Sequence, residues 1–67
     1  MDQEQEMELR RLQEQSLYLC ERLINGLNEN KDDADSFFGG DVYKSYVEAT
    51  ESAINKAKKA KNKIRNL

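Results

Sequence analysis

The sequence is a chain of 67 residues with a formal net charge of −2, in which 36% of the residues are charged and 7% are aromatic. This composition, without Pro, Trp or His, is typical of long helices and coiled coils, and the single cysteine excludes an internal disulfide. A chain this short buries only about 60% of its unfolded surface, so we expect one domain that is supported by self-association or by a partner.

Residues 2–30 are predicted to form the first of two long amphipathic helices. Asp2 is the expected N-cap, and the acidic residues that follow it suit the positive end of the helix dipole. Apolar residues recur in steps of three and four along one stripe, which we expect to face the second helix. This stripe consists of Leu9, Leu12, Ser16, Leu19 and Leu23. Beside it lie Leu17, Cys20 and Ile24, which we expect to remain partly exposed in a lone hairpin and to contact a partner.

Cys20 has two interpretations. One is a nucleophile or redox sensor, and the other is a small apolar residue in a packed surface. The chain has no His that would act as its base. We therefore interpret Cys20 as a packing residue, in a protein from a reducing compartment.

Residues 31–40 interrupt the helical pattern and are predicted to form the turn. Asn, Asp and Ser favour turns here through hydrogen bonds to their own backbone. Gly39 and Gly40 permit a sharp reversal or a positive φ, and Asp41 is the expected N-cap of the second helix. The acidic residues do not match a calcium loop, because a loop that begins at Asn28 lacks the required Gly and Glu.

Phe37 and Phe38 are adjacent aromatic residues in this turn. We expect at least one of them to fold back over Leu27 and Val42 and to close the end of the hairpin. The other is then predicted to anchor a partner, since buried aromatic side chains dominate interface energetics.

Residues 41–66 are predicted to form the second helix, whose main apolar stripe is mostly alanine. The stripe consists of Val42, Tyr46, Ala49, Ala53, Ala57, Ala60, Ile64 and Leu67. Antiparallel pairing sets large residues against small ones, as with Leu12 near Ala60. A second apolar edge lies to one side of this stripe and is predicted to bind a partner. It consists of Tyr43, Val47 and Ile54.

Charge is distributed unevenly, with acidic residues at the start of the chain and basic residues at its end. Antiparallel pairing is predicted to bring residues 2–8 beside the lysine-rich segment 56–65. This segment is also a candidate contact for nucleic acid or an anionic membrane. Because its lysines spread around the helix and no aromatic residues interleave with them, we interpret it as a solvated face.

Localisation and catalysis are constrained by what the sequence lacks. No apolar run approaches the roughly 20 residues that a membrane span needs, and the acidic N-terminal segment lacks the apolar core of a signal peptide. We therefore expect a cytoplasmic protein. A two-helix layer has no room for a water-excluding pocket, so we expect neither an enzyme nor a cofactor.

Residues 39–53, GGDVYKSYVEATESA, resemble the YscE-like co-chaperones of the needle subunit in bacterial type III secretion systems. The matching features are the two glycines, the acidic residue after them and the early aromatic and valine of the second helix. The resemblance implies a helical hairpin in the cytoplasm that binds a larger helical-repeat chaperone, so that the pair keeps the needle subunit soluble until export. It also implies that Tyr46, Val47 and Ile54 belong to the contact surface.

The sequence thus predicts an all-α fold, a single antiparallel two-helix hairpin that completes a four-helix bundle on dimerisation or partner binding. Its predicted function is non-enzymatic binding of another protein through apolar helix edges, as in a type III secretion co-chaperone or adaptor. The alternatives are a self-assembling homodimeric four-helix bundle and a nucleic-acid accessory protein. The predicted partner-binding residues are Leu17, Cys20, Ile24, Phe37, Phe38, Tyr43, Tyr46, Val47 and Ile54.

Overall fold

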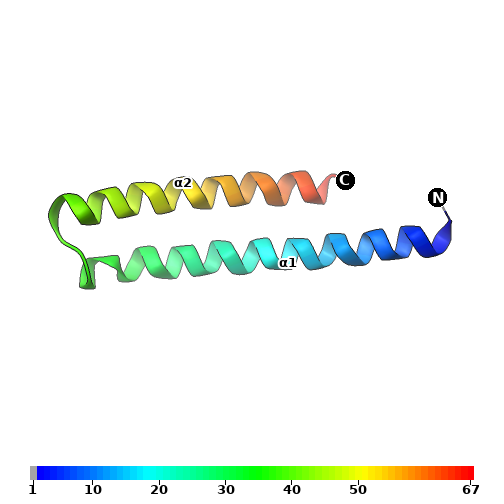
Figure 1. Cartoon of the computed structure of the whole chain (residues 1–67), viewed down its shortest axis with the longest axis horizontal. Helices are drawn as coiled ribbons and strands as arrows, with labels where there is room; N and C mark the ends of the chain where they lie inside the picture. The colour runs from blue at the N-terminus through cyan, green and yellow to red at the C-terminus, as the bar shows by residue number, and fades with distance from the viewer. Residues whose placement is uncertain (1) are drawn as a thin grey trace.

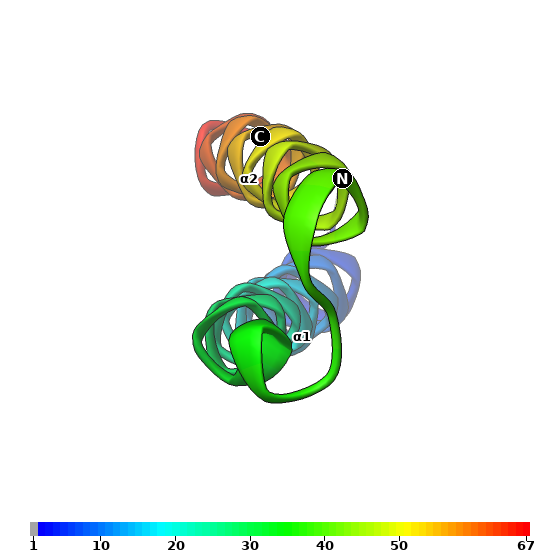
Figure 2. The same cartoon turned by 90° about the vertical axis from the view of Figure 1, so that its left-hand side faces the viewer.

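The computed structural model describes residues 2–67 as two long antiparallel α-helices joined by a short 3-10 helix. α1 spans Gln3–Asp33, η1 spans Ala34–Ser36 and α2 spans Gly40–Arg65. The molecule measures 56 × 16 × 10 Å along its principal axes, and both helices run along the longest of them (Figure 1). Seen from the turn, the two helices form a single layer (Figure 2). The predicted all-α helical hairpin is confirmed.

The N-terminus of α1 is fixed by a capping box. Oδ1 of Asp2 accepts a hydrogen bond from the amide of Gln5 at 2.8 Å, and the side chain of Gln5 accepts one from the amide of Asp2 at 3.4 Å. These bonds satisfy two of the backbone N–H groups that a helix start leaves without intrahelical partners. The prediction that Asp2 is the N-cap is confirmed.

The turn closes around Ala34, which is buried. The amide of Ala34 donates to the carbonyl of Lys31, and the amides of Phe37 and Phe38 donate to the carbonyl of Ala34 at 3.0 and 2.9 Å. Helical structure therefore continues beyond the predicted end near residue 30. Gly40 completes the reversal with a φ of +56°, a conformation that strains residues with a side chain.

α2 begins earlier than predicted. Its N-cap is Gly39, and Asp41, the predicted N-cap, lies in the first turn of the helix. The amide of Tyr43 donates to the carbonyl of Gly39 at 3.4 Å, so the first helical bond already starts at the glycine pair. Asp41 still places its negative charge where the helix dipole favours it.

The helices touch through a different stripe of α1 from the one predicted and through a partly different stripe of α2, of which Ala57 and Ile64 were predicted correctly. Ile24 is only 7% exposed and forms the hydrophobic core with Ile54 and Ala57, while Leu27 packs against this cluster. We call the full set of facing residues, all buried or half-buried, the seam. On α1 and the start of η1 it comprises Gln13, Leu17, Cys20, Ile24, Leu27, Lys31 and Ala34. On α2 it comprises Val47, Thr50, Ile54, Ala57, Lys61 and Ile64.

The apolar arc of α1 is wide enough for two stripes about 80° apart at 100° per residue, and either stripe fits another helix. The observed choice buries the branched side chains of Ile24 and Ile54 and half-buries that of Val47, all of which the predicted choice would have left at the edge. It also brings ion-pair partners together along one flank of the hairpin. These pairs are Lys61 with Glu21 and, at 4.0 Å, Lys31 with Glu51.

Gln13 sets the register at the open end of the hairpin. Its Nε2 donates to the carbonyls of Ile64 and Arg65 at 2.7 and 3.1 Å, in the last turn of α2, where carbonyls lack intrahelical partners. The Ile64 carbonyl also accepts a hydrogen bond from the amide of Leu67 at 3.3 Å. The pairing predicted for Leu12 and Ala60 is therefore wrong by more than one helical turn. The first three turns of α1 project beyond the end of α2 (Figure 1).

We call residues 3–12 of α1 the overhang. Because the overhang has no neighbouring helix, the predicted contact between residues 2–8 and the lysine-rich segment 56–65 is wrong for a single chain. The acidic start and the basic end belong to the same end of the hairpin, but α2 stops before it reaches the acidic residues. The acidic start of α1 and the basic end of α2 therefore do not cover each other within one chain.

Candidate protein-interaction surface

Four large apolar residues of α1 remain in solvent along one line. Their exposed fractions are 46% for Leu9, 45% for Leu12, 56% for Leu19 and 54% for Leu23. Ser16, which is half-buried, occupies the gap in the middle. We call these five residues the leucine stripe. They are the residues that the sequence analysis placed in the contact between the helices. The periodicity of the stripe was identified correctly, but the stripe does not face α2.

The exposed small residues of α2 lie on the same side of the hairpin as the leucine stripe. Ala49 and Ala60 are exposed, and Ala53 is half-buried. At 100° per residue they lie about 80° from the α2 seam, and the leucine stripe lies about 80° from the α1 seam in the same rotational sense. Because the helices are antiparallel, equal rotations of this kind turn both stripes to one side. The leucine stripe and the exposed alanines of α2 therefore face the same side of the hairpin, which we call the apolar face.

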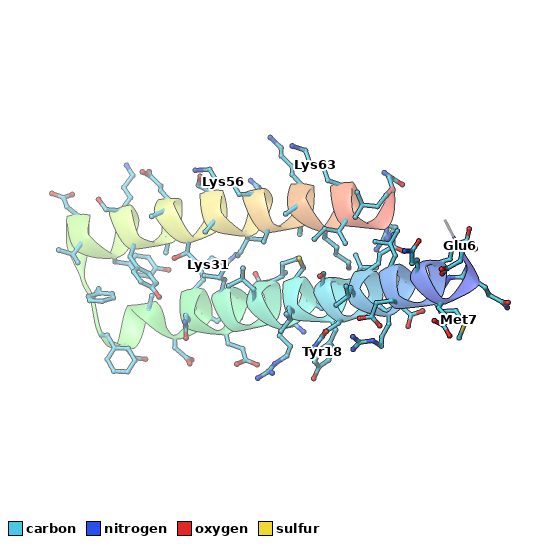
Figure 3. All side chains as sticks on the ribbon, turned by 45° about the vertical axis from the view of Figure 1, so that its right-hand side comes forward. Glu6, Met7, Tyr18, Lys31, Lys56 and Lys63 are labelled. Atoms are coloured by element: carbon cyan, nitrogen blue, oxygen red, sulfur yellow. The ribbon has the colours of Figure 1, made fainter. Side chains whose placement is uncertain are left out.

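The opposite flank of the hairpin is charged. It carries the ion pairs of Glu21 with Lys61 and Glu51 with Lys31. Figure 3 shows Lys31 directed at the space between the helices and Tyr18 directed away from α2. The hairpin as a whole is therefore amphipathic, with one flank closed by ion pairs and the other apolar.

The closed end of the hairpin holds the two aromatic residues of the turn. Phe38 packs on Tyr46, with ring centroids 5.1 Å apart and the rings tilted by 42°. One phenylalanine therefore does pack back on the hairpin, but the partner found is Tyr46 and not the predicted pair of Leu27 and Val42; Val42 is 59% exposed. Phe37 is 79% exposed, and its contact with a partner stays a prediction. A surface hollow with a volume of about 710 Å³ lies at this end and is lined by Asn30, Asp33, Ala34, Phe37, Phe38 and Tyr46.

Several of the predicted partner-binding residues instead hold the hairpin together. Ile24 and Ile54 are buried in its core, so their predicted place on unpartnered edges is wrong. Leu17, Cys20 and Val47 also lie on the seam, where they are half-buried. Besides the aromatic residues at the turn, the residues left for a partner are the leucines that the sequence analysis had placed in the contact between the helices.

Tyr43 and Tyr46 lie at the turn end of α2. Tyr43 is 37% exposed, and Tyr46 is half-buried under the ring of Phe38. Both are close enough to the surface to border a bound partner. Cys20 is a free thiol within the seam, as expected of a packing residue.

The overhang contains one strong ion pair of its own. Arg11 donates to both carboxylate oxygens of Glu8, from Nη2 at 2.6 Å and from Nε at 3.2 Å. This hydrogen bonding, with the attraction of the opposite charge as a smaller cause, lowers the pKa of Glu8 and raises the pKa of Arg11. Both side chains are exposed, so the pair contributes little to stability.

Metal binding and membrane insertion find no support in the described part of the chain. Among residues 2–67 no three His, Cys, Asp or Glu side chains come together as a metal site would require. Neither helix within that range is long and apolar enough to cross a membrane.

The comparisons with known proteins give no match to this chain. No protein-family model matches it, and neither a characterised protein nor a solved structure gives a significant match. The resemblance of residues 39–53 to type III secretion co-chaperones therefore stays a prediction.

Proposed function

We propose that this protein is a non-enzymatic interaction module of the cytoplasm, which binds another helical protein surface on its apolar face. The observation that carries the proposal is the leucine stripe, four leucines in one line that are each about half exposed. Monomeric proteins rarely leave such a contiguous row uncovered, and exposed rows of this kind mark interaction sites.

Covering the stripe would yield a useful amount of free energy. Full burial of a leucine contributes about 1.5–3 kcal/mol, so covering four half-exposed leucines contributes about 4 kcal/mol before the cost of association. Apolar residues at steps of three and four fit an apolar stripe on another helix. A helical partner thus suits the surface better than an extended peptide, which would need a sheet edge.

A type III secretion co-chaperone is one specific form of this proposal. Its support is the resemblance of residues 39–53, and a helical-repeat chaperone would present the kind of helical surface that the apolar face fits. Co-purification of a needle subunit with the chain would support this form. For the nucleic-acid alternative, Lys61 of the basic segment is already engaged with Glu21.

The proposal is tested by placing a photo-crosslinking amino acid, p-benzoylphenylalanine, at Leu19 or at Tyr18. The two positions are adjacent in sequence and similarly exposed, but only Leu19 belongs to the leucine stripe. Illumination of cells that make each variant should give a protein adduct from position 19 at about ten times the yield of position 18. Equal yields, or no adduct from position 19, would overturn the proposal. The mass of the adduct identifies the partner.

A further inference from the structure

We infer that the partner on the apolar face is a second copy of this chain, with the two α1 helices antiparallel and the overhang of each copy covering the hairpin of the other. The inference rests on the proposed function, since it names the occupant of the same surface. Three features of the described residues carry it: the spacing of the leucine stripe, the placement of charge and the length of the overhang.

The spacing of the stripe is self-complementary. Leu9, Leu12, Ser16 and Leu19 follow in steps of three, four and three, which read the same in both directions. A two-fold axis beside residue 14 therefore pairs residue i with residue 28 − i of the copy. It sets Leu9 beside the copy's Leu19 and Leu12 beside the copy's Ser16, so a large residue meets a small one where the helices cross the axis.

The charged residues favour this register over the next possible one, in which the two-fold axis is moved by half a heptad. On the side of the stripe that is turned away from α2, each α1 helix carries Glu8 and Arg22. In an antiparallel pair these flanking residues of the two copies lie opposite each other, which places Glu8 of each copy beside Arg22 of the other. Moving the axis by half a heptad would instead bring Glu8 to the copy's Glu29. Glu8 already bonds Arg11, but its carboxylate has lone pairs for a second guanidinium. By symmetry the favourable pair occurs twice.

The overhang has the length and charge that this arrangement needs. In the stated register, residues 3–12 of one copy lie over residues 16–25 of the other, a part of α1 that α2 runs alongside. The alanines of α2 leave room there for a third helix. Lys56 and Lys63 of that part of α2 point away from their own α1 and are open to another chain, and Glu6 of the overhang points to the α2 side (Figure 3).

The acidic overhang of each copy therefore meets the basic half of the other copy's α2. This is the contact that the sequence predicts between the two ends of the chain, and it forms between copies because α2 is too short to make it within one. A parallel dimer would instead place the acidic segments together.

The arrangement is tested by disulfide formation between cysteines placed outside the seam, in a chain whose native thiol has been removed by Cys20→Ser. Gln15→Cys lies next to the two-fold axis and should form a disulfide dimer under mild oxidation at least ten times faster than Tyr18→Cys, on the far side of α1. Glu8→Cys and Arg22→Cys should each react slowly alone and rapidly when mixed. Circular dichroism checks that each variant is helical, and Cys20→Ala is the substitute background where Cys20→Ser lowers helicity.

Two results would overturn the inference. If Glu8→Cys alone crosslinks as fast as the mixture, the copies are parallel. If Gln15→Cys and the mixture react no faster than Tyr18→Cys, the occupant is not a second copy in this register. A photo-adduct from position 19 with a mass other than twice that of the chain would then leave the proposed function standing while the inference fails.

Discussion

α1 carries two apolar stripes of similar character, of which one is covered by the second helix and the other is exposed. The seam, centred on Ile24, is closed by α2, whereas the leucine stripe lies open on the flank of the hairpin. Both repeat in steps of three and four, and the open stripe is the richer in leucine. The difference shows that hydrophobic periodicity identifies which residues share a helix face but does not decide which face a short partner helix covers.

The largest expected contrast between the two stripes is in the stability of the hairpin. Ile24→Ala empties the core cluster and should lower the free energy of unfolding by about 2–5 kcal/mol, enough to abolish most of the helical signal. Leu23→Ala, its neighbour in sequence, removes a half-exposed side chain and should cost less than about 1 kcal/mol. Urea denaturation followed by circular dichroism, at the lowest workable concentration, measures both. Equal losses would mean that the two stripes are not structurally different.

The turn end of the seam offers a smaller contrast of the same kind. Phe38→Ala removes the ring that packs on Tyr46, and we expect a loss of about 1–2 kcal/mol. Phe37→Ala should change the thermal midpoint of the lone chain very little, because Phe37 is largely in solvent. Thermal melts of the two variants compare them directly. If Phe37→Ala is the more damaging, the two phenylalanines have been assigned the wrong roles.

Sequence reasoning correctly predicted the helical hairpin, the N-cap at Asp2 and the closing role of one phenylalanine. It misplaced the start of α2, because Gly40 at positive φ starts the helix before Asp41. It missed the register, because the side-chain amide of Gln13 fixes the open end through carbonyls of α2, a contact that leaves no trace in periodicity. The leucine stripe was visible in the sequence, but its exposure depends on the rotation of α1 about its own axis.

The overhang contains Leu9 and Leu12 of the leucine stripe and no residue of the seam, so within one chain its helical structure depends on local interactions. Asp2→Ala removes the capping box and should cost about 1 kcal/mol of helix stability, confined to the first turns. Hydrogen exchange should show faster exchange of amides in residues 3–12 and unchanged exchange near Ile54. A loss of protection along the whole hairpin would contradict this separation of overhang and seam.

The smallest effect is a dependence of the overhang on pH. The pKa of Glu8 is lowered from its ordinary value of 4.5 by the hydrogen bonds and the charge of Arg11. The folded-state pKa therefore lies below the unfolded one, so the pair stabilises the helix above about pH 4.5 and this contribution is lost as the pH falls through the lowered value. NMR titration of the Glu8 carboxyl should show the lowered pKa, and Arg11→Gln should return it toward 4.5. An unchanged pKa in Arg11→Gln would contradict the pairing.

The most direct test of the covered leucine stripe is sedimentation equilibrium of the unmodified chain over a range of concentrations. The expected mass is twice the 7.8 kDa of one chain. The double variant Leu12→Asp/Leu19→Asp should have the mass of one chain, because it places charge on the leucine stripe. The control Met7→Asp/Tyr18→Asp, on the far side of α1, should keep the doubled mass. A chain that sediments as a helical monomer up to about 1 mM, where the free energy of association is weaker than about 4 kcal/mol, would contradict self-association through this face.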